Sequence, residues 1–323
     1  VLSILPDETA KAADNGVAAI LNDWALENGD SHLAPDYQKV LEKGLNGIIG
    51  EAEKELEKID LADPNAVHEG SFLQATVISH KAAINFAKRF AALAGQMADK
   101  EKDGSRRSEL IKISEICGWV PANPARTFRE ALQSLWFVHL ITQIETNGHS
   151  MSLGRFDQYV YRYYKEDIRQ NGMTREQALE LIECLYIELS SLTKLRSTKV
   201  AKFNTGHPMY QNLTVGGQTS DGRDATNELS YICLEAMANL RLHQPSLTAR
   251  HHNKCPQEFL LACCNLIKLG LGFPAMFNDE IIIPAMLSRG VTSDDAFNYC
   301  LTGCVEPSVQ GKWGGRYLSL IHI

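Results

Sequence analysis

The sequence lacks the features that would place it in a membrane or export it. Even the mostly apolar residues 131–144 contain Gln133, His139 and Gln143, whereas a spanning helix needs about 20 apolar residues in a row. The N-terminus does not resemble a signal peptide, because a short apolar stub is followed by Pro6 and acidic residues. We therefore expect neither membrane insertion nor secretion.

The sequence also lacks a disulfide framework, a strong charge imbalance and internal repeats. None of the eight cysteines forms a C-x-x-C pair, which favours a reducing cytoplasm. The formal net charge of -7 gives no support for nucleic-acid binding. His251, His252 and Cys255 have side chains that bind zinc, but no second cluster completes a tetrahedral site, so we expect no metal.

Helices dominate the first half of the chain. Periodic apolar residues predict helices from 7 to 28, from about 37 onwards, and from 64 to 99, and the middle of the third (72–93) is apolar on more than one face, which predicts burial. Two Thr-x-x-Glu/Gln tetrads, at 127–130 and 174–177, predict capping boxes that begin two further helices.

Strands and helices alternate in the second half. Short apolar runs predict strands, helical patterns lie between them, and this alternation is typical of a parallel α/β arrangement. The expected strands are 212–215, 245–249, 274–277 and 299–302, and the expected helices are about 223–242, 256–270 and 278–289. No linker separates the two halves, so we predict a single α/β domain over residues 1–323.

A thiol and a carboxylate stand two residues apart after the last predicted strand. Cys304 and Glu306 lie between Gly303 and Pro307, and neither flanking residue suits a helix. An extended backbone points residues i and i+2 to the same side, so the pair would face one space. Taken alone, a cysteine is usually a small buried hydrophobe, but this pairing is also suited to reactive chemistry.

This motif and several others resemble the glycyl radical enzymes, the pyruvate formate-lyase-like superfamily, in the eliminase branch that contains the glycerol and diol dehydratases. The matching segments occur in family order and span most of residues 30–313. They are Gly154–Tyr159, Leu213–Gly217, Asp221–Glu228, Phe277–Pro284, Leu287–Gly290 and Gly303–Pro307. The resemblance implies that the chain is part of the family's α/β barrel.

The resemblance also implies roles for five residues. Cys304 would carry a thiyl radical, Glu306 would act as general base, and His32, His149 and Ser150 would bind substrate hydroxyls. Without the resemblance, the last three would be taken for ordinary loop or capping residues. Ser31 stands where the family's His loop has glycine. Arg155 and Asp157 are expected to form a structural salt bridge and a helix cap.

The implied function is a lyase, either a dehydratase or a C-X lyase, that acts on a small hydroxylated substrate whose identity the sequence leaves open. Three alternatives remain: acyl transfer of the formate C-acetyltransferase type, a polar cysteine nucleophile with His251 or His149 as base, and a non-catalytic scaffold. Acyl transfer in the family uses two adjacent cysteines, whereas Cys304 is preceded by Gly303 and the nearest other cysteine is Cys300.

The expected partners follow from the resemblance. No cofactor would bind directly; a glycyl radical, in a C-terminal segment resembling Arg-Val-x-Gly-Tyr, would be installed by a radical S-adenosylmethionine activating enzyme. That segment is absent from residues 1–323, and the ending Leu318–Ile323 resembles a translated sequencing adapter. We therefore expect a fragment that is inactive alone, from a cytoplasmic homodimer.

Overall fold

A computed structural model of the chain describes residues 32–60, 66–146, 150–193 and 209–312. The chain divides into two compact units, each built from segments that are separate in the sequence. The helical unit comprises residues 36–141 and 158–181, and the sheet unit comprises 1–35, 142–157 and 182–323. We describe each unit by itself, and the single domain inferred from the sequence stays a prediction. The expected helix at 7–28 lies outside the described residues.

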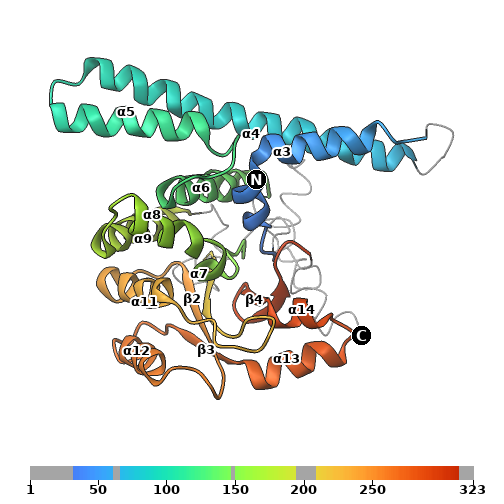
Figure 1. Ribbon diagram of the computed structural model, residues 1–323, viewed down its shortest axis with the longest axis vertical. Coiled ribbons are helices and arrows are strands. Elements are labelled where there is room, and N and C mark those ends of the chain that lie inside the picture. Colours follow the sequence, from blue (N-terminus) through green and yellow to red (C-terminus); the bar gives the residue numbers. More distant parts are fainter. Residues whose placement is uncertain (1–31, 61–65, 147–149, 194–208, 313–323) are drawn as a thin grey trace, which may run out of the picture. The chain divides into compact units, whose positions relative to one another are not determined.

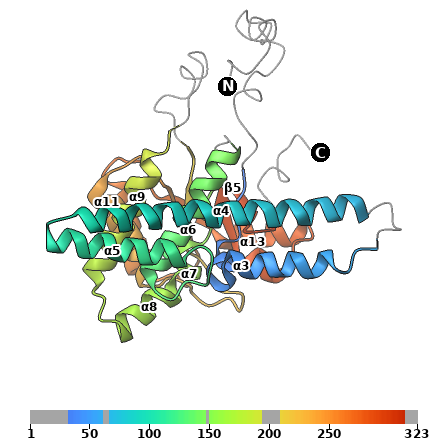
Figure 2. The ribbon, with the colours of Figure 1, turned by 90° about the horizontal axis from the view of Figure 1, so that it is seen from above.

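The helical unit contains three long helices and parts of three helices that cross its boundaries. Its elements are α3 (Tyr37–Leu56), α4 (Ala66–Lys100), α5 (Gly104–Trp119), most of α6 (Phe128–Thr146), part of α7 (Phe156–Tyr159), α8 (Tyr161–Gln170) and the start of α9 (Arg175–Ser191). Figures 1 and 2 both show α4 and α5 packed side by side along their length. No helix in the described ranges is long and apolar enough to cross a bilayer.

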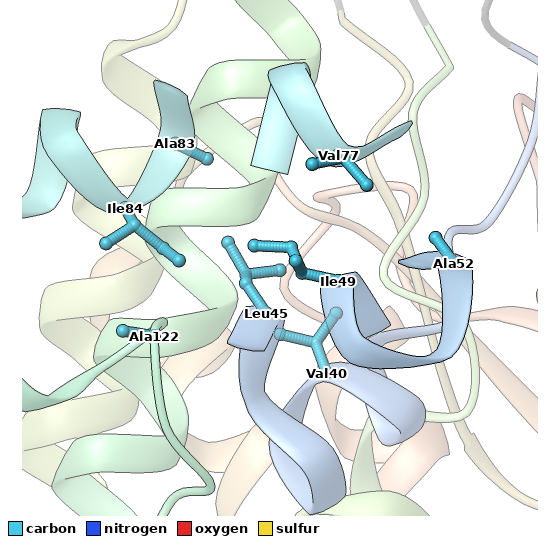
Figure 3. Packing of buried hydrophobic residues seen from close by; sticks show 8 residues of the cluster. All are labelled: Val40, Leu45, Ile49, Ala52, Val77, Ala83, Ile84 and Ala122. Carbon is cyan, nitrogen blue, oxygen red and sulfur yellow. The ribbon is translucent and has the colours of Figure 1, made fainter. Parts of the chain in front are cut away.

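The core of the helical unit forms where α3 meets α4. Apolar side chains from one face of α3 point toward α4 in Figure 3, and Ala122 contributes from the loop after α5. The buried cluster consists of Val40, Leu45, Ile49, Ala52, Val77, Ala83, Ile84 and Ala122. The amphipathic pattern predicted for α3 is therefore confirmed, because its apolar face is the buried one.

The expectation that the middle of α4 is buried is wrong for several of its large side chains, although Val77 and Ile84 are buried. Phe72, Ile78 and Leu93 are 71%, 69% and 53% exposed. The buried positions of this helix are mostly small, such as Ala83 and Ala87. Small residues let α4 lie close to α3 and α5, while the larger side chains lie on the faces that these two helices leave open.

Both predicted capping tetrads begin helices. At the start of α9, the Thr174 Oγ1 accepts from the Gln177 N–H at 3.2 Å and the Gln177 Oε1 accepts from the Thr174 N–H at 3.0 Å, which completes the box. At the start of α6, the Thr127 Oγ1 accepts from the Glu130 N–H at 3.2 Å. The Glu130 carboxylate instead reaches one residue further back, to the Arg126 N–H at 2.8 Å.

The sheet unit has a parallel sheet and a separate hairpin. The sheet, in the order β1-β2-β3, consists of β1 (Asn212–Gly216), β2 (Ser246–His251) and β3 (Ala275–Asn278), and the hairpin consists of β4 (Tyr299–Thr302) and β5 (Glu306–Val309). The helices of this part are α11 (Glu228–Leu240), α12 (Gln257–Ile267), α13 (Asp279–Ser288) and α14 (Ser293–Phe297). The α/β class, the helix-rich first half and the alternating second half are therefore confirmed. In the described residues the strands form an open sheet, not a closed barrel.

Two loops that are distant in sequence extend this sheet beyond β1. Gly154 forms a parallel bridge with Leu213, and Met151 forms one with Leu33. The Leu153 N–H donates to the Asn212 carbonyl at 2.7 Å, and the Ser152 N–H donates to the Leu33 carbonyl at 2.9 Å. Residues 32–34 and 150–154 are thus held next to β1 by backbone hydrogen bonds.

A buried ion pair fixes the hairpin against the sheet. The guanidinium of Arg250, on β2, donates to both carboxylate oxygens of Asp279 at 2.8 and 2.9 Å, and both side chains are fully buried. Arg250 also donates to the Tyr299 carbonyl at 2.7 Å, while the Tyr299 hydroxyl donates to Asp279 at 2.7 Å. The first residue of β4 is therefore clamped between β2 and α13.

A second buried arginine, Arg155, binds the end of β1 and the residues just before β4. Arg155 donates to the carbonyls of Phe297 at 3.2 Å and Gly216 at 2.9 Å. Burial and the neighbouring Arg250 lower the pKa of Arg155 to about 9. The Asp157 carboxylate accepts from the Gly216 N–H at 2.8 Å, so Arg155 and Asp157 both bind the end of β1.

We predict that the buried pair carries a large share of the stability of the sheet unit. Asp279→Asn keeps the shape of the side chain but leaves the Arg250 charge uncompensated in the interior, and should lower the free energy of unfolding by about 3–5 kcal/mol. Urea denaturation measures this change. The matched control is Asp221→Asn, which removes an exposed ion pair with Arg223 and should have little effect. Equal changes in the free energy of unfolding for the two substitutions would contradict the large contribution predicted for the buried pair.

Candidate functional site

A tight turn joins β4 to β5 and carries the predicted cysteine. All four residues of β4 are buried, and the Leu301 N–H donates to the Thr214 Oγ1 of β1 at 3.1 Å. Across the hairpin, the hydroxyls of Thr302 and Ser308 lie 2.7 Å apart. The turn at residues 303–305 is thus presented by a rigid, buried hairpin, labelled β4 in Figure 1. The backbone at Cys304 is a turn and Glu306 begins β5, which agrees with the expectation that this segment is not helical.

Cys304 is exposed in the described part of the chain, and its surroundings favour the protonated thiol. Partial removal from water raises its pKa, and the negative charge of Glu306 raises it further. A raised pKa means that less thiolate forms near neutral pH than for an ordinary cysteine. The site therefore favours an S–H group over a nucleophilic sulfur anion.

Glu306 and His32 both approach Gly303 at the position of its missing Cβ atom. The Glu306 Oε2 lies 2.6 Å, and the His32 Cδ2 lies 3.0 Å, from the point that a Cβ atom on Gly303 would occupy. The same carboxylate oxygen accepts from the Val305 N–H at 2.9 Å. A carboxylate and an imidazole thus share one small space beside the residue that precedes Cys304.

His32 reaches this space from the loop before α3. The next residue, Leu33, forms the bridge to Met151, so the backbone at this point is fixed. The N-cap of α3 is Asp36, whose carboxylate accepts from the Lys39 N–H at 3.0 Å. His32 is therefore not the helix cap, which was its ordinary structural alternative.

Ser150 is buried with a strained backbone. Its φ of 69° is unusual for a residue other than glycine, and its N–H donates to the Met209 carbonyl at 2.7 Å. The Ser150 Oγ is buried and has no hydrogen-bond partner among the described residues. Such a hydroxyl is a candidate ligand donor, because an unsatisfied buried hydroxyl is costly. The neighbouring predicted residue, His149, lies outside the described residues.

Tyr210 is a site residue that the sequence analysis missed. It is partly buried, has a φ of 50°, and lies two residues before the start of β1. Burial and the charge of Cys304 raise its pKa, which places the phenol near the thiol. The sequence offered one signal, an aromatic residue at the entry to a buried strand, but aromatic residues there are usually core.

The possible zinc ligands at the end of β2 have a structural contact instead. The His252 Nε2 lies 3.1 Å from the Asp224 Oδ1, and the Lys254 N–H donates to the His252 Nδ1 at 3.3 Å. In the parts of the chain that the structure describes, no group of three or more His, Cys, Asp or Glu side chains is arranged to hold a metal ion.

The electrostatic coupling between Cys304 and Glu306 can be tested directly. Glu306→Gln removes the negative charge that disfavours the thiolate, so the pKa of Cys304 should fall. The midpoint of a pH series of iodoacetamide labelling, followed by mass spectrometry of the Cys304 peptide, should shift to lower pH. Cys264, which is exposed on α12, serves as the internal control and should label at an unchanged rate. An unshifted Cys304 midpoint would show that the carboxylate does not act on the thiol.

Known proteins of similar sequence and structure share this arrangement of elements. The family model described as pyruvate formate lyase-like matches residues 1–321. The Escherichia coli protein named "Probable dehydratase YbiW" is 43% identical over 295 residues, which covers 90% of this chain and 36% of that protein.

Solved structures give the same result. The glycerol-bound B12-independent glycerol dehydratase from Clostridium butyricum is 49% identical with a TM-score of 0.85, over 88% of this chain and 36% of that one. A glycyl radical enzyme from Archaeoglobus fulgidus is 32% identical with a TM-score of 0.83, over 93% and 40% of the two chains. This chain thus spans little more than a third of the length of these relatives, and it belongs to the pyruvate formate lyase-like family of glycyl radical enzymes.

Proposed function

We propose that this chain forms the thiol-bearing part of the active site of a glycyl radical eliminase, a dehydratase or C-X lyase that acts on a small hydroxylated substrate. The observation that carries the proposal is the meeting of the Glu306 carboxylate and the His32 ring at Gly303, the residue that precedes Cys304. A hydrogen-atom donor, a proton acceptor and a hydrogen-bonding imidazole are the groups that such an elimination requires. The dehydratases among the relatives support this class of reaction.

The reaction would begin and end at the Cys304 sulfur. A thiyl radical on Cys304 takes a hydrogen atom from the substrate carbon that carries a hydroxyl, which forms an S–H bond and leaves the radical on carbon. Glu306 accepts the proton of that hydroxyl. The neighbouring C-X bond then breaks, and the leaving group departs with the bonding electron pair. Returning the hydrogen atom from Cys304 to the product radical regenerates the thiyl radical.

His32, His149 and Ser150 would bind and orient the substrate hydroxyls. Ser150 fits this role because its buried Oγ has no partner in the described part of the chain and would gain one from a substrate hydroxyl. Holding the reacting carbon against the sulfur can lower the barrier by several kcal/mol. Tyr210, which lies close enough to Cys304 for the charge of the thiolate to raise its pKa, would help to exclude water from the carbon radical.

The alternatives fit these contacts less well. A polar cysteine nucleophile needs a thiolate, but the pKa of Cys304 is raised by its surroundings. Acyl transfer through two cysteines would need a second thiol at the turn. Cys300 is fully buried in β4, and burial raises its pKa to about 12.

The radical itself would come from outside this chain. A glycyl radical, when present, supplies the oxidising equivalent that converts the Cys304 thiol to a thiyl radical. We infer that a radical S-adenosylmethionine activating enzyme installs it, that the complete protein is a homodimer in the cytoplasm, and that this chain binds no organic cofactor or metal directly.

Replacing Cys304 tests the assignment. Cys304→Ser in the complete, anaerobically activated enzyme should abolish turnover of small diols and other hydroxylated substrates, because the serine O–H bond is too strong for a carbon-centred radical to abstract its hydrogen atom. Turnover is measured by product formation, and circular dichroism checks the fold. The control is Cys264→Ser, an exposed cysteine on α12, which should keep its activity. Retained turnover in Cys304→Ser, or activity of the unactivated enzyme in air, would contradict the radical mechanism.

A second test concerns Ser150. Ser150→Ala removes a buried hydroxyl with no partner among the described residues, so the free energy of unfolding should stay the same or rise. If Ser150 binds a substrate hydroxyl, kcat/KM should fall about tenfold, the effect of one lost hydrogen bond. Ser152→Ala is the contrast, because the Ser152 Oγ accepts from the Asn212 N–H at 3.2 Å and its loss should lower stability. Unchanged kinetics in Ser150→Ala would remove Ser150 from the site.

A further inference from the structure

The residue before Cys304 has no side chain, and the space that a side chain would occupy is filled. Gly303 is buried in the turn between β4 and β5. An ideal Cβ there would lie 2.6 Å from the Glu306 Oε2, 3.2 Å from the Glu306 Cδ and 3.0 Å from the His32 Cδ2. Contacts below 3.0 Å do not occur at real Cβ atoms, so at least the carboxylate would have to move.

We propose that Gly303 is a positioning residue, whose missing side chain creates the space in which the Glu306 carboxylate and the His32 ring are held beside Cys304. This inference rests on the proposed function, because it explains why Glu306 and His32 lie where the proposed elimination needs them. On this proposal, the absence of a side chain at residue 303 determines where the proton acceptor, the Glu306 carboxylate, lies.

The contacts around Gly303 show why a side chain there would disturb the site rather than the hairpin. The two nearest groups are the ends of side chains, not backbone atoms. The Glu306 Oε2 is also fixed by the Val305 N–H at 2.9 Å, and a charge-assisted bond of this kind would be lost or lengthened if the carboxylate moved. β4 itself stays anchored through the Tyr299 carbonyl and the Leu301 N–H, whose partners Arg250 and Thr214 do not belong to the turn.

Backbone strain must be separated from the loss of space. Gly303 has a φ of +58°, so alanine at this position adds a conformational cost as well as a Cβ. Asparagine tolerates the left-handed region better than other residues and still carries a Cβ. Gly290 is the matched control, because its φ is +84° and nothing lies within 4 Å of the position of its Cβ.

The test compares Gly303→Ala and Gly303→Asn with Gly290→Ala and Gly290→Asn in the complete enzyme. The first measurement, which does not depend on turnover, is the pH midpoint of Cys304 alkylation. Displacing the Glu306 carboxylate should shift this midpoint to lower pH, as Glu306→Gln does, and combining Gly303→Asn with Glu306→Gln should give no further shift. Both Gly290 variants should keep the wild-type midpoint.

The second measurement is anaerobic turnover. A misplaced general base should lower kcat by about a hundredfold in both Gly303 variants and change KM much less, while the Gly290 variants keep the wild-type kcat. A wild-type midpoint and a wild-type kcat in Gly303→Asn would overturn the proposal. If only the proposed function is wrong, the wild-type enzyme will turn over no hydroxylated substrate, yet the Gly303 variants will still shift the alkylation midpoint.

Discussion

The buried ion pair between Arg250 and Asp279 is the interaction on which the arrangement of the sheet unit depends. Taking two charges out of water is expensive, and only close geometry with further hydrogen bonds compensates for it. Here the guanidinium binds both carboxylate oxygens, the Tyr299 carbonyl at 2.7 Å and the Phe297 carbonyl at 3.0 Å. One fully buried arginine therefore joins β2, the start of α13 and the first residue of β4. These bonds fix the position of the β4–β5 hairpin relative to the parallel sheet.

Unusual backbone conformations occur around the proposed site. Three residues there have positive φ: Gly303 at 58°, Ser150 at 69° and Tyr210 at 50°. Glycine adopts this region at little cost, whereas at Ser150 and Tyr210 it persists only where the surrounding structure enforces it. Ser150 is held through its N–H by Met209, and Gly303 by a β4 strand that is buried along its whole length. The two strained residues, Ser150 and Tyr210, thus lie on segments that the Ser150–Met209 backbone hydrogen bond joins, and strained conformations of this kind cluster at ligand-binding sites.

Sequence reasoning succeeded where a local pattern determines the structure. The four predicted strands agree with the observed ones to within two residues at each end, and the capping tetrad at 174–177 begins α9 as expected, because both depend on short-range periodicity and turn chemistry. It failed where the outcome depends on distant neighbours. The apolar residues of α4 gave no indication of which faces would be covered, and Tyr210 showed nothing to distinguish it from a core aromatic. The approach of His32 to Gly303 joins residues about 270 positions apart, so no local pattern could have predicted it.

A carboxylate next to a thiol favours one kind of cysteine chemistry over another: hydrogen-atom transfer over nucleophilic attack by a thiolate. A nucleophilic cysteine is activated by a nearby cation, which stabilises the thiolate, and a carboxylate in that place has the opposite effect. At Cys304 the neighbouring charge is Glu306, and it raises the pKa of the thiol. A hydrogen-atom transfer gains from the same arrangement, because it needs the neutral S–H bond and a separate group to accept the proton of the substrate hydroxyl. The carboxylate would impair a polar mechanism at this sulfur, whereas in the proposed radical elimination it would serve as the proton acceptor, so its position two residues after the thiol supports the radical proposal.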